Sequence, residues 1–200
     1  SDLFDLQDRI AEQVAGAVYP SVRKAEIERA RMKRPDNLEA YDMVMCALSH
    51  GWARRMHEKW EAIALLGRAL SLDPDYGLAA ALAAWAHAQQ IVYNWTDDVA
   101  GEVQKGLALI EKAARHIVEE ATGLTALGTA IMLLEGNARR ALGFIDRAIA
   151  IDPNHAWAWM RRGFGLIYVG EPEEALSAFA RADLVVTYNG VESVFSDQVG

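Results

Sequence analysis

Residues 140–153 read RALGFIDRAIAIDP, and residues 61–74 read EAIALLGRALSLDP. Both stretches place an alanine, a large apolar residue four positions later, a second alanine three further on, and a proline five after that. Such spacing lies on one face of a helix, and the small residues let a second helix approach closely. The Asp-Pro pair ends the helix, because proline cannot continue one and restricts the residue before it. Each stretch therefore predicts the second helix of a helical hairpin.

The same spacing of small and apolar residues, which we call the frame, recurs along the chain at a regular interval. The offset from Ala141 to Ala175 is 34 residues, and that from Ala62 to Ala141 is 79, or two periods of 34 with 11 inserted residues. Because one hairpin cannot bury its apolar face alone, repeated hairpins have to stack on one another. The further positions of the frame are Ala175, Phe179 and Ala182 and, more weakly, Gly106, Ile110 and Ala113.

The last repeat carries most of a known signature, with aromatic, small, large, turn-glycine, alanine, aromatic and alanine positions in order. These are Trp159, Gly163, Leu166, Gly170, Ala175, Phe179 and Ala182. The closing proline is absent, and Val186-Thr187 stand in its place. On these residues the chain resembles the tetratricopeptide repeat (TPR) family, whose period is 34 residues. The resemblance implies an all-α fold, an α-solenoid of about four TPR-like helical hairpins.

The predicted solenoid is preceded by one or two N-terminal helices, since apolar residues recur at helical spacing through residues 3–18 and 22–30. We assign residues 1–36 to this helical junction or cap, 37–188 to the repeats and 189–200 to a truncated or uncapped tail. The repeats are predicted at 37–74, 75–118, 119–153 and 154–188. Their predicted packing residues are Ala62, Leu66, Ala69, Pro74, Ala141, Ile145, Ala148, Pro153, Trp159, Gly163, Ala175, Phe179 and Ala182.

A solenoid normally needs a polar cap on its last apolar face, and Val185–Gly200 shows no closing amphipathic helix. We therefore expect the natural protein to continue, or another chain to cover this end. The charge is also uneven. Residues 163–200 hold six acidic residues against one basic residue, whereas residues 23–34 hold six Lys or Arg against two Glu. The basic stretch is either a solvated helix face or a contact surface for another domain.

The composition indicates a folded segment, with 52% hydrophobic and 24% charged residues. A formal net charge of −8 argues against general affinity for nucleic acid or a membrane surface. The single cysteine, Cys46, leaves no internal disulfide, and neither a secretion signal nor a membrane-spanning stretch is evident. These features predict a cytoplasmic location.

The start of the chain resembles a junction found in bacterial multidomain signalling proteins. The matching residues are 2–11 (DLFDLQDRIA), 25–31 (AEIERAR) and 34–42 (RPDNLEAYD). In that family a class III adenylate/guanylate cyclase domain, or a winged-helix DNA-binding domain, precedes a C-terminal TPR region. The resemblance implies an output domain upstream of Ser1, with adenylate cyclase suspected. It also implies a regulatory role for this segment, since none of its positions matches the cyclase motifs.

Residues suited to catalysis or metal binding are sparse. The five histidines are scattered, with no H-E-x-x-H motif and no paired cysteines. We predict no catalytic residue, metal or cofactor for this segment. His116 and Glu120 are expected to form a surface pair. Gly163-Phe164-Gly165 is expected to serve helix packing rather than phosphate binding, and Cys46 is expected to be a buried, inert thiol.

The TPR resemblance also implies that first-helix residues line a concave groove. The predicted partner-binding residues are Tyr41, Met45, Trp52, Trp85, Trp157, Met160, Phe164 and Tyr168. The Lys and Asn residues that hold a peptide carboxylate in chaperone-binding TPR domains are largely missing, so that type of site is not expected.

Three alternatives follow for this groove. The chain's own helices fill it, because aromatic stripes are usually core. Otherwise it accepts an amphipathic helix or extended segment of a protein partner. That partner is the upstream domain, another protein or a second copy, which would make the chain a homo-oligomer. In the third alternative, a small-ligand pocket is lined by Trp85, His87, Tyr93 and Trp95.

Overall fold

The computed structural model describes residues 38–51, 56–117 and 119–188, and these residues form helices without any strand. The all-α prediction is therefore confirmed. The predicted N-terminal helices, Trp52 and the tail 189–200 lie outside the described residues. None of the described helices is long and apolar enough to cross a membrane. The elements are α2 (Leu38–Gly51), α3 (Met56–Leu72), α4 (Gly77–Val92), α5 (Val99–His116), α6 (Ala121–Ala130), η2 (Ile131–Glu135), α7 (Ala138–Ile151), α8 (Ala156–Val169) and α9 (Pro172–Tyr188).

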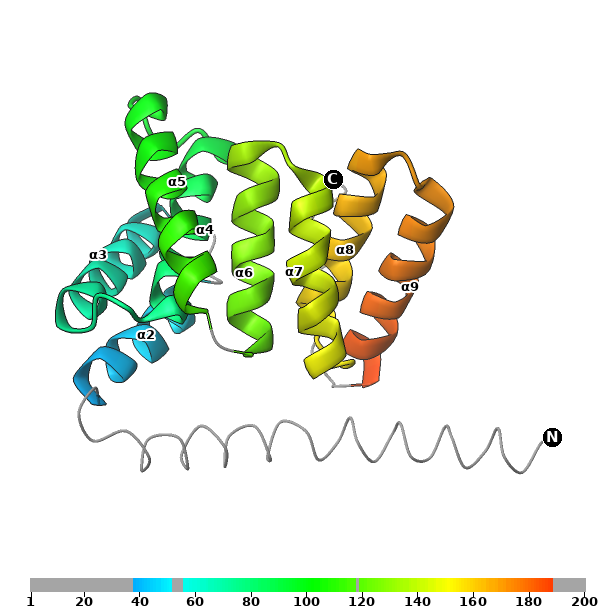
Figure 1. Cartoon of the computed structure of the whole chain (residues 1–200), viewed down its shortest axis with the longest axis horizontal. Helices are drawn as coiled ribbons and strands as arrows, with labels where there is room; N and C mark the ends of the chain where they lie inside the picture. Colours follow the sequence, from blue (N-terminus) through cyan, green and yellow to red (C-terminus); the bar gives the residue numbers. More distant parts are fainter. Residues whose placement is uncertain (1–37, 52–55, 118, 189–200) are drawn as a thin grey trace.

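These helices form four hairpins that stack into an α-solenoid, as Figure 1 shows for α6, α7, α8 and α9 side by side. The hairpins are α2–α3, α4–α5, α6–α7 and α8–α9. Successive hairpins meet where α3 packs on α4, α4 on α6 and α7 on α8. Because short connections reverse the chain direction, the first helices α4, α6 and α8 run parallel to one another.

The predicted small and apolar frame residues lie at the helix contacts. Ala69, Ala141, Ala148 and Ala182 have no exposed surface. Ala62, Leu66, Ile145, Ala175 and Gly163 are also buried, while Trp159 and Phe179 are partly buried against a small cluster of Leu166, Ala175 and Ala178. Pro74 and Pro153 are exposed in the turns.

The two Asp-Pro pairs end their helices in the same way. α3 ends at Leu72 and α7 at Ile151, directly before the aspartate. The carboxylate of Asp73 accepts a hydrogen bond from the backbone N–H two residues later, at 3.2 Å. Asp152 accepts the equivalent bond from Asn154 at 3.0 Å. Each side chain thus closes the turn that leads to the next hairpin.

Helix α6 lies between its neighbours and is buried along its whole length. A Cβ atom on Gly128 would lie 2.7 Å from Ile145 Cγ1 and 2.9 Å from the carbonyl oxygen of Ala141. A glycine is therefore required for the observed approach of α6 to α7. The helix continues as the π-helical turn η2 and ends at Gly136, whose φ of 66° favours glycine.

We expect Gly128→Ala to lower the free energy of unfolding by about 1–2 kcal/mol, because the new methyl group meets the backbone of α7. Urea denaturation followed by circular dichroism measures this change. Gly143→Ala is the matched control: Gly143 lies within α7 with nothing near its Cβ position. It should raise the stability by about 0.5–1 kcal/mol. Equal effects of the two substitutions would contradict the close approach.

Candidate functional site

Trp85 and Trp157, predicted to line the partner-binding groove, instead lie in the core. They are only 4% and 7% exposed, and their ring centroids are 4.7 Å apart. The indoles come from α4 and α8, which both pack on α6. Because α6 presents mainly small residues, the two rings can meet across it. Where these two rings lie, the chain's own side chains fill the predicted groove. Neither tryptophan is therefore available to a partner.

The other predicted groove residues differ in exposure. Tyr41 is partly buried, and Met45, Met160 and Phe164 pack against the core from partly buried positions. Phe164 also meets Phe179 edge-to-face, with ring centroids 5.2 Å apart. Tyr168 keeps 63% of its surface exposed. Of the predicted set that the structure describes, Tyr168 is thus the residue most available to a partner.

Four apolar and aromatic residues are exposed near the ends of α4 and α8. Because these helices run parallel, their carboxyl ends lie at the same edge of the solenoid. Tyr93, which is 45% exposed, stacks on Trp95 with centroids 4.8 Å apart. We call the four exposed residues the rim surface. They are Val92, Tyr93, Ile167 and Tyr168.

Arg161 of α8 lies near the two rim tyrosines, since Tyr93 and Tyr168 both act electrostatically on its guanidinium. The guanidinium carbon is 5.8 Å from the centre of the Phe164 ring. Arg161 Nε is buried without a hydrogen-bond partner. Burial lowers the pKa of Arg161 below its usual value, although the two tyrosines oppose that shift. Within the described part of the chain, this cation near the rim surface therefore has a buried Nε with no hydrogen-bond acceptor.

Arg161 differs in this respect from three arginines that lie close to a carboxylate. Arg140 Nη1 bonds Glu135 at 2.6 Å, Arg162 Nε bonds Asp146 at 2.9 Å, and Arg147 lies 3.6 Å from Glu119. Sequence alone places Arg161 on the first helix of its repeat. It does not show that the neighbouring residues are aromatic rather than acidic, since Tyr93 comes from another hairpin.

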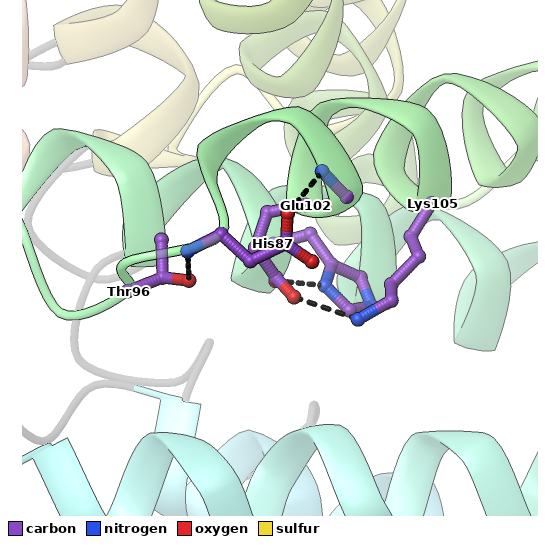
Figure 2. Close-up of polar contacts among 6 residues, drawn as sticks. His87, Thr96, Glu102 and Lys105 are labelled. Atoms are coloured by element: carbon purple, nitrogen blue, oxygen red, sulfur yellow. Dashed lines mark hydrogen bonds and ion pairs between the residues drawn. The ribbon is translucent and has the colours of Figure 1, made fainter.

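A buried polar cluster ties α4 to α5 (Figure 2). His87 Nδ1 donates to Glu102 Oε2 at 2.5 Å, and Lys105 Nζ donates to Glu102 Oε1 at 2.9 Å. Glu102 is only 2% exposed. Burial raises the pKa of this carboxyl, but the bonds from His87 and Lys105 outweigh burial, so the pKa lies below its usual value of 4.5. The cluster holds the second hairpin together through a buried carboxylate.

Sequence analysis missed this cluster, although a signal was present. Glu102 shares a helical face with Gly106, Ile110 and Ala113, which are buried. An acidic residue in a buried stripe requires a buried partner. The partner, His87, lies 15 residues away on another helix, so sequence spacing does not identify it.

The predicted small-ligand pocket is not formed by the four residues expected to line it. Trp85 faces α8, whereas His87, two residues later, bonds Glu102 of α5. Tyr93 and Trp95 stack on each other in the connection after α4. A small cavity does lie between α2, α3 and α4. Its lining is almost entirely apolar and comprises Ala47, Leu48, Ala62, Leu66, Leu82, Trp85, Ala86 and Gln89.

Two other expectations are corrected by the structure. Cys46 is exposed rather than buried, because its neighbours Val44 and Ala47 turn the buried face of α2 away from it. His116 lies 3.4 Å from Asp75, not beside Glu120. Glu120 instead caps α6, accepting from the N–H groups of Thr122 and Gly123.

The glycines at 163 and 165 serve packing, as expected. Cβ atoms there would lie 2.5 Å from the Phe179 ring and 2.8 Å from Leu142. Across the described residues, no three His, Cys, Asp or Glu side chains come together to hold a metal ion.

No family model matches the chain, and no curated protein matches it. Several solved structures are similar to it. A MamA structure designated MSR-1 C2 is 18% identical, with a TM-score of 0.46 over 88% of this chain and 97% of that one. A second MamA structure is 16% identical, with a TM-score of 0.49 over 82% and 86%. YrrB, described as a TPR protein with an unusual peptide-binding site, is 22% identical, with a TM-score of 0.46 over 84% and 85%. The TPR-like character of this chain rests on its own stacked hairpins.

We expect Glu102→Gln to lower the free energy of unfolding by about 1–3 kcal/mol, because a neutral amide replaces the carboxylate that His87 and Lys105 share. Chemical denaturation at neutral pH measures this loss. Glu111→Gln is the control, since exposed Glu111 lies 3.6 Å from Arg140. A change within about 0.5 kcal/mol is expected there.

The contribution of Glu102 should also depend on pH. Its folded-state pKa lies below 4.5, the usual value expected in the unfolded chain. The carboxylate therefore stabilises the fold above about pH 4.5, and this stabilisation is lost as the pH falls through the folded-state pKa. The difference in unfolding free energy between wild type and Glu102→Gln should shrink on acidification. A difference that grows would contradict the lowered pKa.

Proposed function

We propose that the solenoid is a non-catalytic module that binds a protein partner at the rim surface. The observation that carries this proposal is the pair of exposed tyrosines, Tyr93 and Tyr168, that lie near Arg161. Tyrosine and arginine side chains contribute much of the binding energy at protein interfaces. Here they come from two different hairpins, so a partner would contact both at once.

Two polar clusters have structural roles that fit this proposal. Glu102 is buried and fully engaged between α4 and α5. His155 accepts a bond from the N–H of Ala158 at the start of α8, and its other ring nitrogen lies 3.3 Å from Thr122 Oγ1. Both clusters join helices, whereas Tyr93 and Tyr168 are exposed at the rim surface. Binding rather than catalysis is therefore the function we propose.

The wider context of the module rests on sequence resemblance alone. The stretches at 2–11, 25–31 and 34–42 support a bacterial signalling protein in which the module regulates an adenylate cyclase domain. A winged-helix transcriptional regulator is the alternative, and both would be cytoplasmic. The coding sequence upstream of Ser1 tests this: cyclase motifs support the first, and a winged-helix domain the second.

A second copy of the chain is a further candidate partner. Helix α9 exposes Leu176 and Leu184, which lie two helical turns apart on one face. Exposed apolar residues in such a row are typical of interaction surfaces. Light scattering over a wide concentration range tests self-association, and a monomer throughout would exclude it.

We expect Tyr93→Ala and Tyr168→Ala together to abolish the retention of specific partners on the immobilised chain. Both side chains are substantially exposed, so the unfolding midpoint should remain near that of wild type. Quantitative mass spectrometry of retained proteins measures the loss. Leu72→Ala is the matched control, since Leu72 is 49% exposed at the end of α3 and lies outside both proposed contact surfaces. Retention that is unchanged by the tyrosine variant, or equally lost in the control, would exclude the rim surface.

A further inference from the structure

Arg161 carries a buried polar atom whose hydrogen bond is not made. Within the described part of the chain, its Nε has no acceptor. The Phe164 ring lies 5.8 Å from the guanidinium carbon, so an aromatic face covers part of the charged group. A buried donor without an acceptor is unfavourable, and more so when it belongs to a charged group. An acceptor supplied by a partner would remove this cost.

The next residue, Arg162, shows how an arginine of the same helix is satisfied. Its guanidinium carbon lies 5.9 Å from the centre of the Trp159 ring, a distance close to that between Arg161 and Phe164. The Nε of Arg162, however, donates to the carboxylate of Asp146 at 2.9 Å. The two neighbouring arginines thus share an aromatic contact and differ at Nε. The comparison indicates that a carboxylate is the group that Arg161 requires.

A carboxylate from a protein partner suits this guanidinium. It can accept two parallel hydrogen bonds, one from Nε and one from a terminal nitrogen. Arg161 as a whole is only partly buried, so a rotamer change of the kind common on binding can turn it toward an incoming group. The net charge of −8 disfavours a polyanion such as nucleic acid. A single acidic side chain is therefore favoured over a row of phosphates.

The position of Arg161 on α8 also constrains the residues around that acidic side chain. Tyr168 lies seven residues beyond Arg161, or about 10 Å along the helix axis. An extended peptide rises about 3.3 Å per residue, so about three residues cover the same distance. Ile167 and Tyr168 are both exposed there, and a large apolar side chain would gain free energy by covering them.

We propose that Arg161 determines the specificity of the rim surface by binding an acidic side chain of the partner. The segment that binds is extended and carries Asp or Glu with a large apolar residue within about three positions. The acidic side chain pairs with Arg161, and the apolar one contacts Ile167 and Tyr168. This inference rests on the proposed function, since the segment belongs to the partner that binds the rim surface, and it adds the chemistry of that partner.

Selection of random linear peptides displayed on phage against the immobilised chain tests the proposal. The retained peptides should be enriched in Asp or Glu with a large apolar residue within about three positions. A synthetic copy of the leading peptide is then compared with a copy whose acidic residue is replaced by the corresponding amide. The replacement should weaken binding about tenfold or more, because it removes a charge-assisted hydrogen-bonded pair. Fluorescence anisotropy measures both affinities.

Substitutions in the chain complete a double-mutant cycle. Arg161→Gln should weaken binding of the acidic peptide by a similar factor, and this variant should bind the acidic and amide peptides alike. Arg162→Gln is the matched control, since Arg162 already pairs with Asp146. Its affinity for the acidic peptide should remain within about twofold of wild type. Circular dichroism reports whether the helices of each variant persist.

The inference and the proposed function can fail separately. Retained peptides without enrichment in acidic residues overturn the inference, whereas their loss from the Tyr93→Ala and Tyr168→Ala variant would still support the rim surface. Equal affinity for the acidic and amide peptides overturns it even if Arg161→Gln fails to fold. Equal losses in the Arg161 and Arg162 variants also overturn it, as does a library from which no peptide is retained.

Discussion

The absence of a side chain at Gly128 lets α6 approach the backbone of α7, and much of the structure depends on this approach. The same constraint operates at Gly163, which faces the ring of Phe179 between α8 and α9. Gly77 likewise meets the backbone of His116, where the second hairpin closes. At each point a methyl group would force two helices apart. Because each hairpin positions the next one, a displacement at one contact would pass along the solenoid.

Close packing of α6 also determines which aromatic side chains stay exposed. With α6 buried and small-sided, Trp85 and Trp157 meet across it and fill the centre of the predicted groove. Apolar burial of this kind stabilises the fold but removes the side chains from the surface. Tyr93 and Tyr168 remain exposed at the ends of α4 and α8. The candidate site is therefore at the edge of the solenoid rather than at its centre.

The sequence predicts the helical frame well because the frame depends on local spacing. The spacing of Ala62, Leu66 and Ala69 puts them on one face of α3, and that face lies in the core. The site is harder to predict, because it depends on which hairpins come together. Nothing near Trp157 in sequence indicates that Trp85 covers it. Similarly, the nearness of Arg161 to Tyr93 is a property of the folded molecule, since Tyr93 comes from another repeat.

The long connection within the second hairpin explains why the candidate site lies at the edge of the solenoid. Its helices are joined by a longer connection, from Tyr93 to Asp98, in which Asn94 adopts a φ of 54°. Asp98 begins α5 by capping the N–H of Gly101, and Glu102 then binds His87 across the hairpin. These polar contacts hold α4 and α5 together, so the long connection between the two helices does not have to align them. The connection is thereby free to carry Tyr93 and Trp95 at the edge of the solenoid, where an insertion alters the surface without disturbing the stacked core.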